Sequence, residues 1–80
     1  MERTAVLSSN IKSVGYDQKS KKLEIEFMNG GIYEYDGVAK ETYDDMINAT
    51  SIGSFFYHNI KGQYLFNKKW LTGLNQNKNL

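Results

Sequence analysis

The residues that most often carry catalysis are few and isolated in this chain. His58 is the only histidine among the 80 residues, and no acidic residue lies near it in the sequence. A general base needs an orienting partner and a substrate pocket, and the sequence around this histidine supplies no partner. Asp44 and Asp45 are adjacent, so on a helix their side chains point about 100° apart and do not form a catalytic pair. The sequence therefore predicts a protein that is not an enzyme.

Metal, phosphate and nucleophile sites have equally little support. The chain has no cysteine, and its carboxylates do not recur at the spacing of metal ligands. The Asn-Gly-Gly run at 29–31 is too short to cradle a phosphate, and it lies between two expected strands. Ser8 and Ser9 are better explained by a turn than by a nucleophile. We therefore expect no metal, no cofactor and no small-molecule substrate.

Lysines near the C-terminal end are the residues that indicate a binding role. The formal charge of the chain is +1, but residues 61–80 contain four lysines and no acidic residue. Local positive charge favours an anionic partner, although a solvated segment that aids solubility is the commoner explanation. For RNA, we expect weak and salt-sensitive binding through a few phosphate contacts. The candidate nucleic-acid-binding residues are Lys12, Lys61, Tyr64, Lys68 and Lys69.

A protein-interaction role is the alternative, and it rests on the aromatic residues of the same segment. Phe66, Trp70 and Leu74 recur at the spacing of a short amphipathic helix. In one interpretation Trp70 anchors a protein partner or a second copy of the chain, and in the other it folds back to complete a small core. The candidate protein-interaction residues are Phe66, Trp70, Leu71 and Leu74.

Alternating apolar and polar residues predict the sheet that positions these side chains. We expect strands over residues 10–17, 22–28 and 32–36, the last two joined by a hairpin. A two-residue hairpin loop would put the tyrosines on the same face as the glutamates, whereas a three-residue loop that ends at Gly31 pairs Phe27 with Tyr33. We expect the longer loop, because it keeps the apolar residues together. The resulting apolar face comprises Leu23, Ile25, Phe27, Tyr33 and Tyr35, and the opposite face carries Glu24, Glu26 and Glu34.

From Val38 onward the apolar period becomes helical. A first helix is expected to end near residues 50–53, and a second to begin after Ser54 and to end at Gly62. These elements predict an α+β fold: a small antiparallel three-stranded sheet followed by two helices packed on one face, plus a short C-terminal tail. Residues 1–64 would form the domain, and residues 65–80 a basic, Asn-rich tail that is at most partly ordered.

Several separated blocks of the sequence resemble one known family. The blocks are Val6-x-Ser8-Ser9-Asn10-Ile11-x-Ser13-Val14-Gly15-Tyr16-Asp17, Leu23-Glu24-Ile25-Glu26-Phe27, Gly31-x-Tyr33-x-Tyr35 and Ser51-x-Gly53-x-Phe55-Phe56-x-x-x-Ile60-Lys61-Gly62-x-Tyr64. In this order, over about residues 3–64, the chain resembles the KTSC domain, which is named after the C-terminus of some lysyl-tRNA synthetases. The family also occurs as small stand-alone bacterial and phage proteins.

The resemblance implies a binding module with RNA as its ligand, a proposal for the family that rests on the fusion to the synthetase. Two departures are visible here: Ala39 stands where family members often carry proline, and a Lys- and Asn-rich segment follows Tyr64. The chain also lacks cysteine and any apolar run long enough to cross a bilayer. We therefore expect a soluble, cytoplasmic protein.

Overall fold

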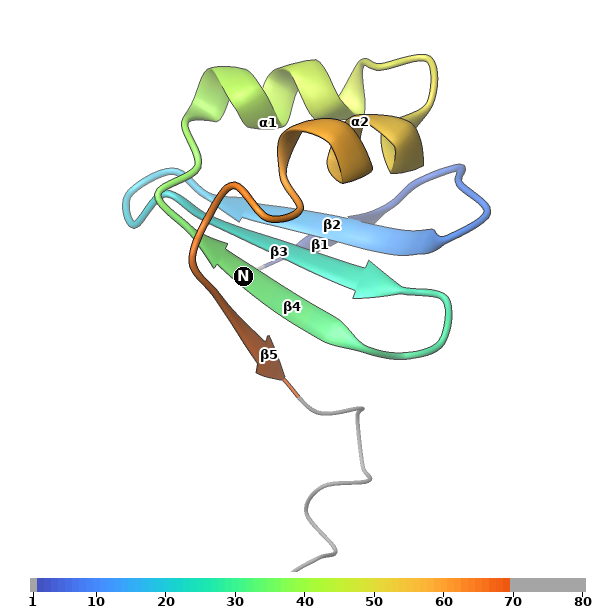
Figure 1. Cartoon of the computed structure of the whole chain (residues 1–80), viewed down its shortest axis with the longest axis horizontal. Helices are drawn as coiled ribbons and strands as arrows, with labels where there is room; N and C mark the ends of the chain where they lie inside the picture. Colours follow the sequence, from blue (N-terminus) through green and yellow to red (C-terminus); the bar gives the residue numbers. More distant parts are fainter. Residues whose placement is uncertain (1, 70–80) are drawn as a thin grey trace, which may run out of the picture.

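The computed structural model describes residues 2–69, which form one sheet and two helices. The elements in chain order are β1 (Arg3–Ala5), β2 (Ile11–Asp17), β3 (Lys22–Phe27), β4 (Ile32–Asp36), α1 (Lys40–Ile47), α2 (Ile52–Asn59) and β5 (Phe66–Lys69). All paired strands are antiparallel, and their order in the sheet is their order in the chain. Both helices lie on the same face of the sheet, and the chain returns after α2 to add β5 beside β4 (Figure 1).

The sheet has five strands, so the prediction of a three-stranded sheet is wrong, although the α+β class holds. The expected strands are present as β2, β3 and β4, and the two additional strands lie at the two edges. β1 has three exposed residues and no apolar alternation that sequence could detect. β5 occupies Phe66–Lys69, where the apolar spacing predicted a helix. Pairing with the open backbone groups of β4 decides the conformation here, because tertiary context outweighs local periodicity.

The β3–β4 hairpin has a register that differs by two residues from the prediction. Tyr33 pairs with Ile25 instead of Phe27. The loop has three residues, as expected, but they are residues 28–30, and Gly30 has the positive φ angle of 93° in place of Gly31. The Gly30 N–H donates to the Phe27 carbonyl oxygen over 2.8 Å and closes the turn. A shift of two residues leaves every side chain on its predicted face, because side chains alternate with period two.

The main core lies between the helices and the inner face of the sheet. Val14, Leu23 and Ile25 are fully buried there, as are Met46 and Ile60 from the helical side. Burial of these apolar surfaces supplies most of the stability of so small a sheet. The two helices are therefore fixed over the inner face, which positions the side chains of α2 relative to the strands.

Each helix contacts a different part of the sheet through aromatic rings. α1 lies over β2, where the rings of Tyr43 and Tyr16 stack with centroids 4.9 Å apart. α2 lies over β3 and β4, because the Phe56 ring contacts Phe27 at 5.4 Å and Tyr35 at 5.6 Å. Among the described residues, no aromatic ring of either helix contacts a ring of β5. The inner face is therefore partly open between α2 and β5.

Helix α2 begins earlier than predicted. The sequence suggested a start after Ser54, but the helix begins at Ile52, because the Ser51 Oγ accepts a hydrogen bond from the Ser54 N–H at 3.2 Å. The side chain of an N-cap residue satisfies a backbone donor that has no partner within the helix. The earlier start brings Gly53 into α2, where it lines a hollow described below.

Candidate functional site

The outer face of the sheet, which the helices do not cover, centres on Glu24. This side chain is buried, and its carboxylate is contacted from both edges of the sheet. The Arg3 Nη1 of β1 lies 3.0 Å from Glu24 Oε1, and the Lys69 Nζ of β5 lies 3.0 Å from Glu24 Oε2. The hydrogen bond to Glu24 raises the pKa of the Lys69 ammonium group. One carboxylate therefore joins both edge strands to the centre of the sheet.

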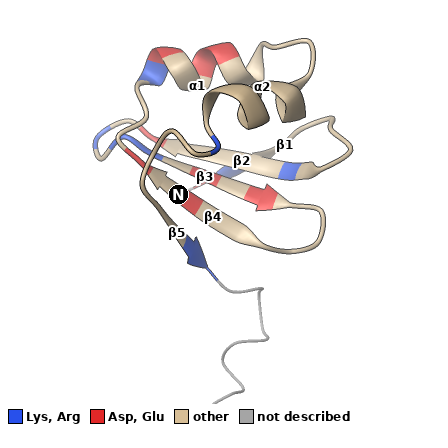
Figure 2. Cartoon of the chain, viewed as in Figure 1, with Lys and Arg blue, Asp and Glu red and all other residues tan. Residues whose placement is uncertain are grey.

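The other carboxylates of the outer face are paired as well. Lys22 Nζ lies 2.7 Å from Asp36 Oδ1 and 3.8 Å from Glu34 Oε1. Ser13 Oγ donates to Glu26 Oε1 at 2.8 Å. Figure 2 shows acidic segments in red along β3 and β4, and the basic end of β5 in blue. The three glutamates predicted for this face are present, and their mutual repulsion is offset by cationic partners from β1, β3 and β5.

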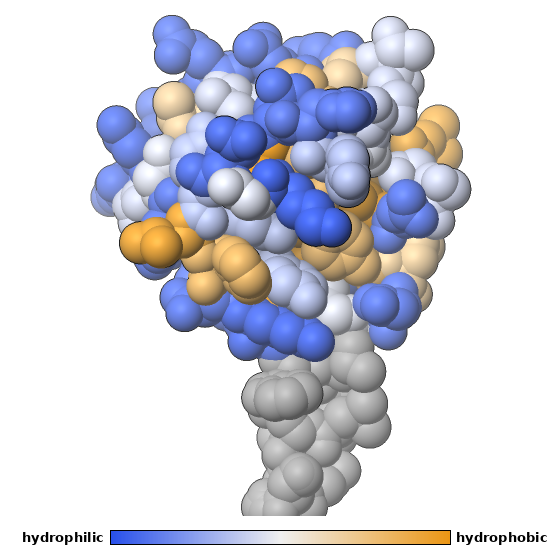
Figure 3. Space-filling view, viewed as in Figure 1, coloured by the Kyte–Doolittle hydropathy of each residue, from blue (hydrophilic) through white to orange (hydrophobic). Residues whose placement is uncertain are grey.

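The opposite, inner face carries a groove between α2 and β5. Aromatic rings of three strands and one helix line it, and we call it the aromatic groove. Its ring-bearing residues are Phe27, Tyr33, Tyr35, Phe56, Tyr57 and Phe66. In Figure 3, hydrophobic residues are visible at the centre of this view, with hydrophilic residues around them. This arrangement of an apolar floor and a polar rim is typical of ligand sites.

The rings of the groove form one continuous surface. Phe66 contacts both Tyr33 and Tyr35, with centroids 5.5 Å apart in each case. Burial raises the pKa of the Tyr35 hydroxyl to about 12, so this residue belongs to the floor. Phe66 and Tyr57 are 51% and 60% exposed, so their rings are available to a ligand.

Two lysines lie at the rim of the groove. Lys61 Nζ is 5.2 Å from the centroid of the Tyr57 ring, and Lys68 Nζ is 5.7 Å from that of Tyr33. A cation over an aromatic face gains only about 0.5–1 kcal/mol at an exposed site. Among the described residues that line the groove there is no Asp or Glu. The groove therefore combines aromatic surface with positive charge.

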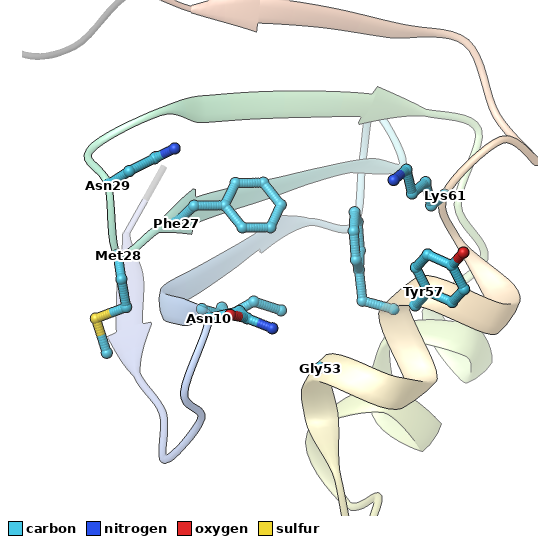
Figure 4. Close-up of a pocket in the computed structure, with 9 residues that line it drawn as sticks. Asn10, Phe27, Met28, Asn29, Gly53, Tyr57 and Lys61 are labelled. Carbon is cyan, nitrogen blue, oxygen red and sulfur yellow. The ribbon is translucent and has the colours of Figure 1, made fainter.

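The groove consists of two adjoining hollows. The first has a volume of about 400 Å³ and lies between the β3–β4 hairpin and α2. Figure 4 shows Asn10, Phe27 and Asn29 on one side of it, and Tyr57 and Lys61 on the opposite side. The second has a volume of about 540 Å³ and lies between α2 and β5, beside Tyr33, Phe66 and Lys68. Both volumes are within the range of about 300–1,000 Å³ of small-molecule sites.

The structure brings some of the predicted site residues together and separates others. Lys61 and Lys68 meet at the groove, whereas Lys69 lies on the outer face with Glu24. Lys12 is exposed on β2, beside an irregularity in its pairing with β3, and lines neither hollow. Tyr64 is half-buried against the core. The basic edge predicted from these lysines is therefore not a single surface.

The predicted protein-interaction residues are only partly described. Phe66 is exposed on β5 and lines the second hollow. Its place in a strand means that the helix predicted to carry it is absent over Phe66–Lys69. Trp70, Leu71 and Leu74 lie outside the described residues. A role for these three in binding a partner stays a prediction.

The sequence led us to expect Phe27, Tyr33 and Tyr35 on the apolar face of the sheet and Phe66 in a protein interaction, so it did not predict the groove. Tyr35 and Phe56 are buried, and both also line the groove. Tyr57 was not considered as a site residue, and Asn29 was considered only as part of the hairpin turn. The strand character of β5 places Phe66 opposite Tyr35 and so completes the groove.

Metal-binding clusters and membrane-spanning helices are both absent from the described part of the chain. Within residues 2–69, no three or more His, Cys, Asp or Glu side chains group in a way that could hold a metal ion. Over the same residues, neither helix is long and apolar enough to cross a membrane.

Comparisons with known proteins agree on one family. The model of the KTSC domain matches residues 7–64. An uncharacterized protein of Stutzerimonas stutzeri is 38% identical over 64 residues, which are 80% of this chain and 90% of that protein. The crystal structure of a KTSC domain protein from Yersinia pestis superposes with a TM-score of 0.84 and 40% identity, covering 86% of this chain and 97% of the other.

A larger protein contains a similar segment. A lysine–tRNA ligase of Nostoc punctiforme is 43% identical over 58 residues, which are 72% of this chain. These residues are only 10% of the ligase, so the similarity concerns a small part of that enzyme.

Proposed function

Because this chain belongs to the KTSC domain family, we propose that it is a non-catalytic binding module whose ligand is single-stranded RNA and whose binding site is the aromatic groove. A location in the cytoplasm, expected from the absence of cysteine, is part of the same proposal. The lysine–tRNA ligase with a similar segment acts, by its name, on an RNA. RNA is therefore a ligand class that at least one relative encounters.

The observation that carries the proposal is the combination of exposed aromatic rings with two lysines in a groove whose described lining residues include no Asp or Glu. Unstacked bases pack on aromatic side chains, and each such contact contributes about 1–3 kcal/mol to binding. Lys61 and Lys68 stand at the rim, where the phosphates of a strand would pass. A duplex does not suit the groove, because its bases are already stacked on one another.

The outer face is the weaker candidate for an RNA contact. Its lysines are bound to carboxylates, and a phosphate would have to compete with Glu24 and Glu34 for Lys69. The same charges that stabilise the sheet therefore disfavour a polyanion on this face. We place the RNA on the groove face for this reason.

The test is a titration of the protein with a fluorescently labelled single-stranded RNA of ten nucleotides at two salt concentrations. The matched variants are Lys68→Gln on the groove face and Lys69→Gln on the outer face. We expect Lys68→Gln to weaken binding several-fold and to reduce the slope of log K against log salt by about 0.7, the value for one phosphate contact of a single strand. Lys69→Gln is expected to leave both quantities unchanged.

Two outcomes contradict the proposal. One is the absence of binding at low salt by the natural chain, whose folding is checked by its NMR spectrum. The other is an equal loss of affinity in the two lysine variants, because it would mean that the RNA does not distinguish the faces.

A protein-interaction or self-association role is the alternative proposal, through Phe66 and the following residues Trp70, Leu71 and Leu74. It is supported by the exposure of Leu65 (82%) and Phe66 (51%) at the beginning of β5. Exposed apolar residues side by side favour a partner surface. A mass that rises with protein concentration in analytical ultracentrifugation, and that returns to the monomer value in Phe66→Ser, would favour this role over RNA.

A further inference from the structure

We infer that the aromatic groove holds two consecutive nucleotides, one base in each hollow, with the phosphate that links them on Lys61. This inference rests on the function proposed above and adds the number of nucleotides and the place of each. It follows from how the two hollows share their walls.

The two hollows are neighbours with a common wall. Four residues line both of them: Phe27, Asn29, Phe56 and Lys61. The remaining walls differ, since Tyr57 and Gly53 line only the first hollow and Phe66 and Lys68 only the second. A ligand that fills both therefore passes the shared residues, and Lys61 is the one cation among the described residues that borders both spaces.

Each hollow has its own exposed ring on which a base can stack. In the first the ring is Tyr57, and in the second it is Phe66, which continues the surface of Tyr33. The floor between them is formed by Phe56, whose ring stands at 70° to both Phe27 and Tyr35. Two exposed rings separated by a shared wall can each stack on one base. A ligand with a single large ring system would not reach both of them.

The first hollow also has a group that can recognise a base by hydrogen bonding. Asn29 Oδ1 accepts from the Gly31 N–H at 2.8 Å, and this bond fixes the side-chain amide at the mouth of the hollow. The Nδ2 group keeps two hydrogens to donate, and it is suited to a base oxygen or ring nitrogen. Asn29 borders both hollows, so a preference for particular bases is expected from this residue.

The two lysines then have different roles. Lys61, which borders both hollows, is placed for the linking phosphate, whereas Lys68 borders only the second and is placed for the phosphate on its outer side. Both ammonium groups lie over aromatic rings in the free protein. Binding would move each ammonium group from its ring to a phosphate and uncover the ring for the base.

The test is a length series of one sequence: adenosine monophosphate, then the dinucleotide, trinucleotide and hexanucleotide, titrated into ¹⁵N-labelled protein at low salt. We expect the dinucleotide to bind about tenfold tighter than the mononucleotide or better, because it adds a second stacked base. The trinucleotide should bind less than about threefold tighter than the dinucleotide, because no third ring is offered. Amide shifts are expected around both hollows, at Gly53 and Tyr57 and at Gly62 and Phe66.

A ligand variant tests Lys61 without altering the fold. A dinucleotide with a neutral methylphosphonate link should bind the natural chain several-fold more weakly than the phosphate form, and the two forms should bind Lys61→Gln equally. The Lys68→Gln variant is the control, since it should keep the difference between the two ligands.

The outcomes separate this inference from the function on which it rests. If the hexanucleotide binds but its shifts are confined to one hollow, or if the mononucleotide binds as tightly as the dinucleotide, the two-nucleotide arrangement is overturned while RNA binding stands. If the neutral link has no effect, the role of Lys61 is overturned. If no oligonucleotide binds at low salt, both the inference and the proposed function fail.

Discussion

Lys68 and Lys69 are neighbours in the chain, yet they belong to two different environments. On the outer face, Lys69 Nζ lies 3.0 Å from Glu24 and 3.6 Å from Glu34. On the groove face, Lys68 Nζ lies 5.7 Å from the centre of the Tyr33 ring, in a groove that no described carboxylate lines. Consecutive side chains of a strand point to opposite faces, so one step along the chain changes the partner. The difference shows that the alternation of a strand decides which groups surround each of two neighbouring lysines.

Reversing the charge of each lysine in turn should give the largest contrast. Lys69→Glu places a second negative charge beside the buried carboxylate of Glu24, so we expect the free energy of unfolding to fall by about 2 kcal/mol. Lys68→Glu should lower it by less than about 0.5 kcal/mol, because this side chain is exposed on the groove face, away from Glu24. Urea unfolding followed by circular dichroism measures both. Equal losses in the two variants would remove the distinction between the faces.

Removing only the charge of Glu24 should have the next largest effect. Glu24→Gln keeps the shape of the side chain but weakens its contacts with Arg3 and Lys69, and we expect a loss of about 1–2 kcal/mol. The matched control is Glu41→Gln at an exposed position in the first turn of α1, for which less than about 0.5 kcal/mol is expected. Denaturant unfolding of the two variants side by side makes the comparison. A loss in Glu24→Gln no larger than in the control would mean that the network contributes nothing measurable.

The dependence of the unfolding free energy on alkaline pH tests whether Tyr35, in the floor of the groove, is buried. Burial raises the pKa of Tyr35 to about 12, above the ordinary value of 10.0. The unfolded chain therefore loses this proton at lower pH, so the stability that Tyr35 contributes is fully present below about pH 10 and is lost as the pH rises towards about 12. Tyr35→Phe should reduce the fall in unfolding free energy over this interval. An unchanged slope would show that the hydroxyl is not buried.

The raised pKa of Lys69 acts in the same direction, so it serves as the control for this measurement. Its ammonium group is stabilised in the folded protein by Glu24, and this contribution is also lost at high pH. The difference between the natural chain and Tyr35→Phe should therefore be the same in a Lys69→Gln background.

The smallest effect is expected for an ion pair with a similar distance but two exposed side chains. Lys40 Nζ lies 3.0 Å from Asp44 Oδ2 on α1, and the two side chains are 50% and 45% exposed. Exposed pairs of this kind contribute about 0.3–0.5 kcal/mol, so Lys40→Gln should change the midpoint of urea unfolding only slightly. A loss as large as that of Glu24→Gln would mean that burial does not set the strength of these pairs.

The central strands could be predicted because the alternation of apolar and polar residues indicates which face of each strand is buried. Leu23, Ile25 and Phe27 alternate with polar residues, and this pattern determined the faces even though the register was two residues away. The edge strands have no such alternation between buried and exposed residues. β1 is exposed along its whole length, and the apolar spacing that includes Phe66 fits a helix as well as it fits the strand that forms. Their pairing partners, which lie far away in the chain, decide their conformation.

The candidate site was predictable in composition but not in position. The excess of lysine beyond residue 60 indicated where an anion could bind. Which of these lysines share a surface depends on the alternation of β5, and hence on knowing that Phe66–Lys69 is a strand. The alternation pattern predicts that the strand tyrosines are part of the core. That they also line a groove depends on the gap between α2 and β5, which no local pattern predicts. Sequence patterns predict which face of a strand is buried, but they do not predict which part of that face a helix leaves uncovered.

The position of Glu24 also has a consequence for the kinetics of folding. Its two cationic partners come from the first and the last strands of the sheet, and Lys69 lies 45 residues away in the chain. Contacts between residues so far apart require long loops to close, so they are expected to form after the main transition state of folding. Weakening them would then accelerate unfolding and leave the rate of folding nearly unchanged. The contacts of the two edge strands would therefore determine the unfolding rate of the sheet more than its folding rate.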